Sequence, residues 1–420
     1  MAGAILAIGV LVFLAHFFTA LFERKRVPDV LLLTILGILI GPIGHFVKPE
    51  DFGHVGRVMS TLALIVILFE SGITIDPPVL ARAIRPTLRV TFATFFATVI
   101  AAYFASVYLL GVPHMTGWIA GAILGGVSAA VVIPLVKSMK IREPLGTTLV
   151  MESALGDVLC IVILLGLVEG AAAGSVQPAK IIGSIVASLL MAALIGSAGG
   201  IGWVLVLNKV RQFPNTAFTT LAVVFILYGV ADELGFSGAI AALAFGATLT
   251  NYDHFGLSKL KAFQGRDLAR IEQTDVSFFM EILFLLKTFF FVYLGVSIRF
   301  EDVTLIGWAA VFCAAVYLAR LLIVRFALIN ENISWQDLAL SSIMAPKGLV
   351  AAVLAGLPVD RGIDGAIAVR NFTYMVVLIS ICWTALFIPV TDKGPLGSFY
   401  RWIFRNKQYE GDAQYAQTEH

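Results

Sequence analysis

Charged residues are scarce in this chain of 420 residues, because Asp, Glu, Lys and Arg together make up only 13% of it. Soluble domains carry about twice that share, roughly 25%. Hydrophobic residues make up 59% of the chain, against about 45–50% in soluble domains. A water-soluble fold could not bury so much apolar surface, so the composition excludes a soluble protein. The net charge of +2 is too small to indicate a nucleic-acid partner.

Cysteine is also rare, and motifs that mark enzymes or ATP-driven pumps are missing. Cys160, Cys313 and Cys382 lie inside apolar runs without a CxxC pair. This placement favours small core residues over a disulfide framework or a metal site. The sequence has no Walker motif, no HExxH and no nucleophile elbow, which are the signatures of ATP-driven and hydrolytic chemistry. We therefore expect neither an enzyme nor a cofactor.

Long apolar runs dominate the chain. Most are long enough to cross about 30 Å of hydrocarbon at about 1.5 Å per residue. They predict an all-α polytopic membrane protein with about 13 transmembrane helices. The expected spans are 3–22, 28–47, 58–75, 88–110, 116–137, 147–169, 180–208, 216–233, 237–250, 279–298, 303–329, 336–356 and 371–391.

Positive charges predict the orientation of these spans. If the N-terminus is outside, the inner loops and the tail hold 20 of the 29 Lys and Arg residues, and the outer loops hold six. Cytoplasmic loops carry an excess of Lys and Arg. We therefore expect a multi-pass protein of the cell membrane with its N-terminus outside and its C-terminus in the cytoplasm.

Two spans carry helix-breaking residues at corresponding positions. The fifth span reads Gly121-Ala-Ile-Leu-Gly-Gly-Val-Ser-Ala-Ala-Val-Val-Ile-Pro134, and the twelfth reads Ser341-Ser-Ile-Met-Ala-Pro-Lys-Gly348. If spans 1–6 and 8–13 form two halves, each is the fifth span of its half. Matched interrupted helices indicate a transporter's binding site near the membrane midplane. The alternative is two ordinary kinks in packing helices.

A central set of four ionisable residues lies inside spans, where charge is costly and therefore informative. They are Glu152, Asp157, Arg320 and Lys347. Glu152 and Asp157 are about 140° apart around a helix of 3.6 residues per turn, so they face different neighbours. Burial disfavours the charged form of a carboxylate, so a proton and a metal cation would compete for Asp157. The alternative for Asp157 is a buried pair with a cation.

For Glu152, a structural ion pair with Arg320, Lys347 or both is favoured over a transport role. Glu70 and Lys287 occupy spans three and ten, which are also equivalent positions in the two halves. They could pair with each other or serve as secondary functional residues.

At these residues the chain resembles the cation/proton antiporter superfamily, on the side of the prokaryotic NhaP-type sodium/proton exchangers. The most specific matches are Met151-Glu-Ser-Ala-Leu-Gly-Asp157 and Ala345-Pro-Lys-Gly-Leu-Val350. Weaker matches run from Val27-Pro-Asp-Val-Leu-Leu-Leu33 through Leu68-Phe-Glu-Ser-Gly72 to Phe289-Phe-Phe-Val-Tyr-Leu-Gly295. The resemblance implies two inverted repeats with crossed unwound helices and a homodimer.

The resemblance also implies a domain plan. Residues 1–87 and 179–298 would hold the dimerisation and linking helices, with helices 1–3 in the first range and 7–10 in the second. Residues 88–178 and 299–392 would hold core helices 4–6 and 11–13. Residues 393–420 would form a short cytoplasmic tail.

The same resemblance implies roles for individual residues. Asp157 matches the ion-binding aspartate, Ser128 stands where relatives have a threonine, and Val127 would offer a carbonyl. Glu152 and Arg320 match an ion pair of electroneutral members, and Lys347 stands where many members have arginine.

Two departures remove polar groups from the expected site. Gly156-Asp157 replaces Asn-Asp or Asp-Asp, and Ser128-Ala-Ala130 replaces Thr-Asp-Pro. Backbone carbonyls, Ser128, Ser153 and water must therefore supply more of the ligands for a Na⁺ or K⁺ ion at Asp157.

We therefore predict Na⁺/H⁺ exchange by alternating access, electroneutral at 1:1 because a single carboxylate titrates. K⁺/H⁺ exchange and electrogenic exchange are the nearer alternatives. An organic-anion transporter of the same architecture, and a channel or sensor, are more remote ones.

Overall fold

The computed structural model describes residues 2–25, 27–75, 77–139, 141, 145–172, 178–212, 218–253, 271–300, 302–328, 333–391 and 394–404. Within the described residues, each of the thirteen predicted spans coincides with a helix or a broken helix, and no strand is present. Residues 216, 217 and 329 of these spans lie outside the described residues. The predicted all-α fold is therefore confirmed. Seven of the helices in these ranges are long and apolar enough to cross a membrane.

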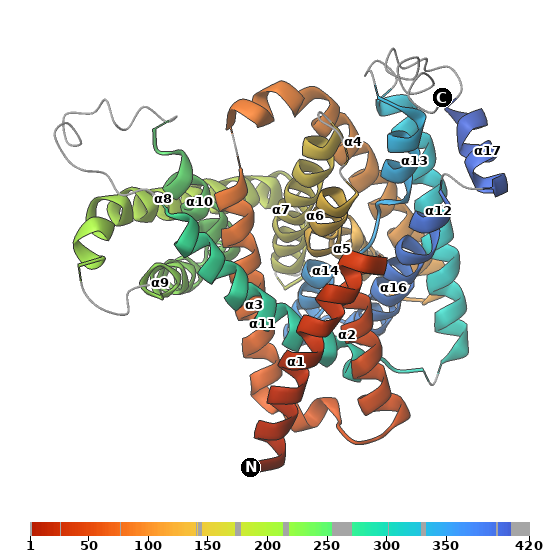
Figure 1. The fold of residues 1–420 in the computed structure, drawn as a ribbon, viewed down its shortest axis with the longest axis horizontal. Coiled ribbons are helices and arrows are strands. Elements are labelled where there is room, and N and C mark those ends of the chain that lie inside the picture. The colour runs from red at the N-terminus through yellow and green to blue at the C-terminus, as the bar shows by residue number, and fades with distance from the viewer. Residues whose placement is uncertain are drawn as a thin grey trace. The chain divides into compact units, whose positions relative to one another are not determined.

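The helices follow the chain in the order shown in Figure 1. Four α-helices lie in the first quarter of the chain, and π-helical turns extend the second and the fourth of them. The broken helices are α5 with α6 and α13 with α14 and α15. The bounds are α1 (Ala2–Lys25), α2 (Asp29–Ile38), α3 (Gly53–Thr74), α4 (Pro77–Phe104), α5 (His114–Leu124), α6 (Ala129–Ser138), α7 (Leu145–Ala172), α8 (Pro178–Val210), α9 (Thr219–Glu233), α10 (Gly238–Asn251), α11 (Gln273–Ser297), α12 (Val303–Ala327), α13 (Trp335–Ile343), α14 (Leu349–Leu354), α15 (Leu357–Asp360), α16 (Ala366–Phe387) and α17 (Gly394–Ile403).

The chain divides into two compact units. Unit 1 comprises the described residues within 1–51, 82–168 and 291–420, and unit 2 those within 52–81 and 169–290. The predicted roles of the domains, as core and dimerisation parts, stay predictions.

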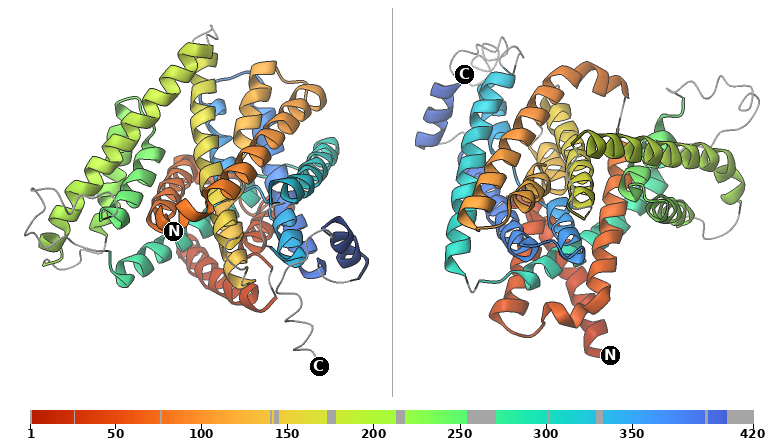
Figure 2. Two further views of the ribbon diagram at one scale, coloured as in Figure 1. Left: turned by 90° about the horizontal axis from the view of Figure 1, so that it is seen from above. Right: turned by 180° about the vertical axis from the view of Figure 1, so that it is seen from behind.

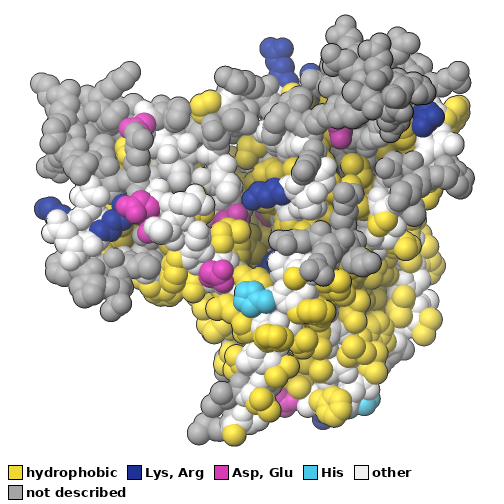
Figure 3. All heavy atoms as spheres, viewed as in Figure 1, with side chains coloured by type: hydrophobic (Ala, Val, Ile, Leu, Met, Phe, Trp, Pro, Cys, Tyr) yellow, Lys and Arg dark blue, Asp and Glu magenta, His cyan; other side chains and the backbone are white. Residues whose placement is uncertain are grey.

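Unit 1 is built around α12 and α16. Helix α12 packs against α16 and α13, and α16 also contacts α5 and α14 (Figures 1 and 2). Apolar side chains of α1 face outward, including Leu6, Ile8, Phe13 and Phe17, and apolar side chains cover much of the surface seen in Figure 3. An outward apolar surface of this kind suits a lipid environment.

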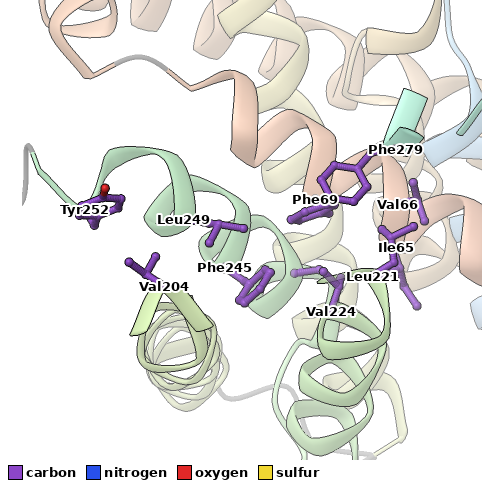
Figure 4. Packing of buried hydrophobic residues seen from close by; sticks show 11 residues of the cluster. Ile65, Val66, Phe69, Val204, Leu221, Val224, Phe245, Leu249, Tyr252 and Phe279 are labelled. Carbon is purple, nitrogen blue, oxygen red and sulfur yellow. The ribbon is translucent and has the colours of Figure 1, made fainter. Parts of the chain in front are cut away.

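Unit 2 has its own core, in which α10 packs against α8, α3 and α9. Figure 4 shows the buried aromatic side chains of this core. Phe69 lies edge-on to Phe279 with ring centroids 5.2 Å apart. A Cβ at Gly246 would collide with the carbonyl of Phe69, so glycine allows α10 and α3 to touch. Small residues at such crossings let helix backbones approach closely in membranes.

Candidate functional site

Two broken helices meet inside unit 1. Helix α5 ends at Leu124 and α6 begins at Ala129, while α13 ends at Ile343 and α14 begins at Leu349. The breaks touch directly, because the backbone N–H of Ser128 donates to the Pro346 carbonyl at 2.8 Å. The crossed, unwound pair predicted from the sequence is thus present. Four helix ends, with their partial charges and with backbone groups that need partners outside their own helix, lie close to the crossing.

Glycines allow this close crossing. A Cβ at Gly348 would lie 2.5 Å from Cβ of Ser128 and collide with its Oγ. On the other side, a Cβ at Gly156 of α7 would lie 3.3 Å from Cα of Gly126. The glycine that departs from the family pattern therefore brings α7 against the first break. Pro134 lies within α6 rather than in the break.

Asp157 is buried in α7, with 3% of its surface exposed. Among the described residues its Oδ2 has no hydrogen-bonding partner, and neither has the buried Oγ of Ser128. The positive charge of Lys347 acts on the Asp157 carboxylate. Burying a carboxylate oxygen without a partner costs free energy. Binding of a proton or a cation removes that cost.

The other predicted ligands are buried nearby in the chain. Val127 lies in the first break. Ser153 lies four residues before Asp157 on α7, and its Oγ donates to the Val150 carbonyl at 2.8 Å. The hydroxyl is the donor in that bond, so its oxygen keeps acceptor capacity. The roles of Val127, Ser128, Ser153 and Asp157 in binding an ion stay predictions.

Glu152 pairs with Arg320 inside the unit. The guanidinium reaches both carboxylate oxygens: Nη2 donates to Oε2 at 2.7 Å and Nη1 contacts Oε1. Nη1 also donates to Thr94 Oγ1 at 2.8 Å, and Nε donates to the Ser341 carbonyl at 3.2 Å. Arg320 thereby joins α12 to α4, α7 and α13. Bidentate geometry with further hydrogen bonds is what a buried ion pair needs.

Lys347 binds backbone instead. Its Nζ donates to the Gly126 carbonyl at 2.8 Å, so the ammonium group neutralises the carbonyl-rich C-terminal end of α5. Its backbone N–H donates to Ser380 Oγ at 2.9 Å. Of the two cations predicted for Glu152, Arg320 makes the direct pair, and Lys347 joins the two breaks.

Several residues at the crossing were not singled out by sequence reasoning. Cys160 accepts a hydrogen bond from the Gly126 N–H at 3.0 Å. On α16, Thr384 Oγ1 reaches the Ile343 carbonyl at 3.4 Å, and Tyr317 of α12 donates to the Ser380 carbonyl at 2.8 Å. The four-residue spacing of Ser380 and Thr384, one face of an apolar helix, is the signal that could have revealed them.

Glu70 and Lys287 lie elsewhere, on α3 and α11 within unit 2, and both are half-buried. Each takes part in at least one polar or electrostatic interaction. The pairing of the two, and a functional role for either, stay predictions.

An all-helical membrane fold with two broken helices crossing beside a buried carboxylate defines a secondary transporter. The sodium/hydrogen exchanger transmembrane family matches residues 10–391, and the chain belongs to that family.

Named relatives fall into two groups. The chain is 26% identical over 370 residues to Na(+)/H(+) antiporter 1 of Methanocaldococcus jannaschii, covering 83% of this chain and 81% of that protein. It is 24% identical over 390 residues to the K(+)/H(+) antiporter NhaP of Alkalimonas amylolytica, covering 90% of this chain and 64% of that protein. It is 26% identical over 366 residues to the K(+)/H(+) antiporter NhaP2 of Shewanella sp. strain MR-4, covering 86% of this chain and 61% of that protein.

The fold also matches a solved structure. The sodium proton antiporter MjNhaP1 from Methanocaldococcus jannaschii, solved at pH 8, superposes with a TM-score of 0.69 at 23% identity. The match covers 92% of this chain and 99% of that one. The similarity shows a shared fold.

Proposed function

We propose that this protein is a secondary active antiporter that exchanges a monovalent cation for a proton, with Asp157 as the group that binds each in turn. The observation that carries the proposal is the buried Asp157 oxygen without a partner, on the helix that packs against the crossed breaks. Membership of the sodium/hydrogen exchanger family and relatives named for Na⁺/H⁺ and K⁺/H⁺ antiport support it.

The chemistry follows from one site with two competing ligands. A proton neutralises the Asp157 carboxylate, and so does a cation held by that carboxylate together with the Val127 carbonyl, Ser128, Ser153 and water. If the carrier reorients only when the site is neutral, outward movement of one ligand requires inward movement of the other. One carboxylate exchanges one proton for one monovalent cation, so the cycle is electroneutral.

Na⁺ is the proposed cation and K⁺ the alternative. Relatives bearing either name match this chain to similar identity, and the site supplies few side-chain oxygens. We further propose a homodimer in the cell membrane, with the N-terminus outside, the C-terminus in the cytoplasm and no resident cofactor.

The test is proton flux in proteoliposomes driven by imposed gradients of Na⁺, Li⁺ or K⁺, comparing wild type with Asp157→Asn. We expect flux with at least one cation, and its loss in Asp157→Asn. Asp302→Asn is the matched control, because Asp302 lies before α12 and Asn can also cap a helix. Flux that survives Asp157→Asn would contradict the site and favour the organic-anion alternative.

The stoichiometry is tested on the same vesicles under an imposed membrane potential. Electroneutral exchange predicts rates that do not respond to the potential. Rates that follow the potential would show that charge moves in each cycle and would favour the electrogenic alternative.

A further inference from the structure

Cys160 sits at the crossing, although its sequence context suggested only a small core residue. It lies three residues after Asp157 on α7 and is 1% exposed. Residues three apart on a helix are neighbours on one face, and the charge of Asp157 acts on the Cys160 thiol. Cys160 and Asp157 therefore lie on the same face of α7, toward the first break.

The thiol holds a backbone group that has no helical partner. Its Sγ accepts the Gly126 N–H at 3.0 Å and lies 3.8 Å from the Ile123 carbonyl, to which the S–H can donate. Gly126 lies beyond the end of α5, so its backbone groups are outside the hydrogen-bond ladder of that helix. Buried groups of this kind need another partner.

The backbone of Gly126 is consequently held on both sides of its Cα. Cys160 takes its N–H, and Lys347 Nζ donates to its carbonyl at 2.8 Å. The next two residues, Val127 and Ser128, are those proposed to face the ion. The two peptide units that flank Gly126 therefore restrain the segment that carries the Val127 carbonyl and the Ser128 hydroxyl.

A second observation points to a ligand at this place. Asp157 Oδ2 and Ser128 Oγ are both buried, and neither has a partner among the described residues. The thiol therefore holds the backbone of the first break near two oxygens that the proposed antiport assigns to binding a proton or a cation. The other fully buried cysteine, Cys313, instead donates to the Val376 carbonyl of α16 at 3.9 Å.

We propose that Cys160 is a positioning residue for the cation: by holding the Gly126 N–H it sets the spacing between the Asp157 carboxylate and the backbone of the break, and so sets cation affinity and selectivity. This inference rests on the proposed antiport at Asp157. Cys160 does not touch the ion itself.

The test compares Cys160→Ala, Cys160→Ser and Cys313→Ala in proteoliposomes. We expect Cys160→Ala to raise the half-saturating cation concentration by about 3- to 10-fold, the size expected from losing one hydrogen bond, and to change the ratio between Na⁺, Li⁺ and K⁺. Cys160→Ser keeps a small acceptor at the same place, so its half-saturating cation concentration should lie within about twofold of the wild-type value. Cys313→Ala should leave affinity and selectivity unchanged.

A binding measurement that needs no turnover accompanies the kinetics. Cation-dependent thermal stabilisation in detergent reports affinity for the folded protein, and it should weaken in Cys160→Ala but not in Cys313→Ala. Cys160→Ala with unchanged half-saturation and an unchanged ion ratio would overturn the inference, whether or not its maximal rate falls. An inactive wild type, by contrast, would refute the antiport itself.

Discussion

Contact between Gly348 and Ser128 sets how closely the two breaks approach each other. Replacing Gly348 with alanine places a Cβ 2.5 Å from that of Ser128, so the breaks must separate. We expect Gly348→Ala to lose about 1–3 kcal/mol of stability, the usual cost of overpacking a tight core, and to lose most exchange activity. Thermal unfolding and proteoliposome flux measure the two effects.

Gly202→Ala is the matched control for that substitution. It lies within α8, and a Cβ there meets nothing within 4 Å. We expect unchanged activity and slightly higher stability, because alanine favours a helix over glycine. Equal stability and equal activity of the two variants would show that the contact between Gly348 and Ser128 does not set how closely the breaks approach.

The Glu152–Arg320 pair is the most deeply buried charge pair in the described part of unit 1, with Arg320 fully buried and Glu152 2% exposed. Arg320→Met leaves the carboxylate buried without its partner, which costs about 3–5 kcal/mol in other proteins. The double variant Arg320→Met with Glu152→Leu removes both charges and should recover much of that loss. Thermal unfolding of wild type, Arg320→Met, Glu152→Leu and the double variant gives the coupling. A double variant as unstable as Arg320→Met would contradict the predicted structural role.

At the scale of elements, the start of α12 depends on Asp302. Its Oδ1 accepts the N–H groups of Thr304 at 2.9 Å and Leu305 at 3.2 Å. Hydrogen bonding to Thr304 and Leu305 holds the pKa of Asp302 below its ordinary value. A lowered pKa stabilises the folded state above the ordinary value of about 3.9, and that stabilisation disappears as the pH falls through the lowered value.

This sign gives a prediction for the first turn of α12. Amide hydrogen exchange in residues 303–306, corrected for intrinsic rates, should lose protection as the pH falls below about 4. Asp302→Asn caps without titrating, so its protection should vary less with pH. Identical pH dependence in both proteins would contradict the role of the carboxylate.

The C-terminal tail contains a helix that the sequence did not predict. Residues 393–420 were predicted only as a short tail, yet residues 394–403 form α17, which packs against α13. Arg401 lies 5.0 Å over the Trp335 ring at the start of α13, and Phe404 is buried. Burial raises the pKa of Tyr400 on the same helix. These contacts join residues some 65 positions apart, so no local sequence pattern could predict them.

The sequence predicted most of the fold and part of the site for identifiable reasons. The spans were visible because lipid requires long apolar helices, and Asp157, Glu152, Arg320 and Lys347 stood out because charge inside a membrane is rare. The choice of Arg320 over Lys347 as the partner of Glu152 depended on tertiary geometry. Cys160 was missed because an isolated cysteine in an apolar run looks like any small core residue.

For the whole molecule, a single shared site ties the pH profile to the cation concentration. Reciprocal linkage requires a proton to weaken cation binding as much as the cation weakens proton binding. With 1:1 competition, a tenfold rise in cation should move the acid limb of the exchange rate by about one pH unit toward acid. Rates against pH at several cation concentrations, equal on both sides of the vesicle, measure the shift. An acid limb that stays fixed would indicate separate sites.

The link from the Ser128 N–H to the Pro346 carbonyl uses main-chain atoms alone. Every amino acid except proline at position 128 can supply that donor, so the junction of the two half-helices tolerates changes in the side chains around it. Substitutions among the side chains at the crossing can therefore change which cation the proposed site prefers, while the main-chain link between the two breaks is kept.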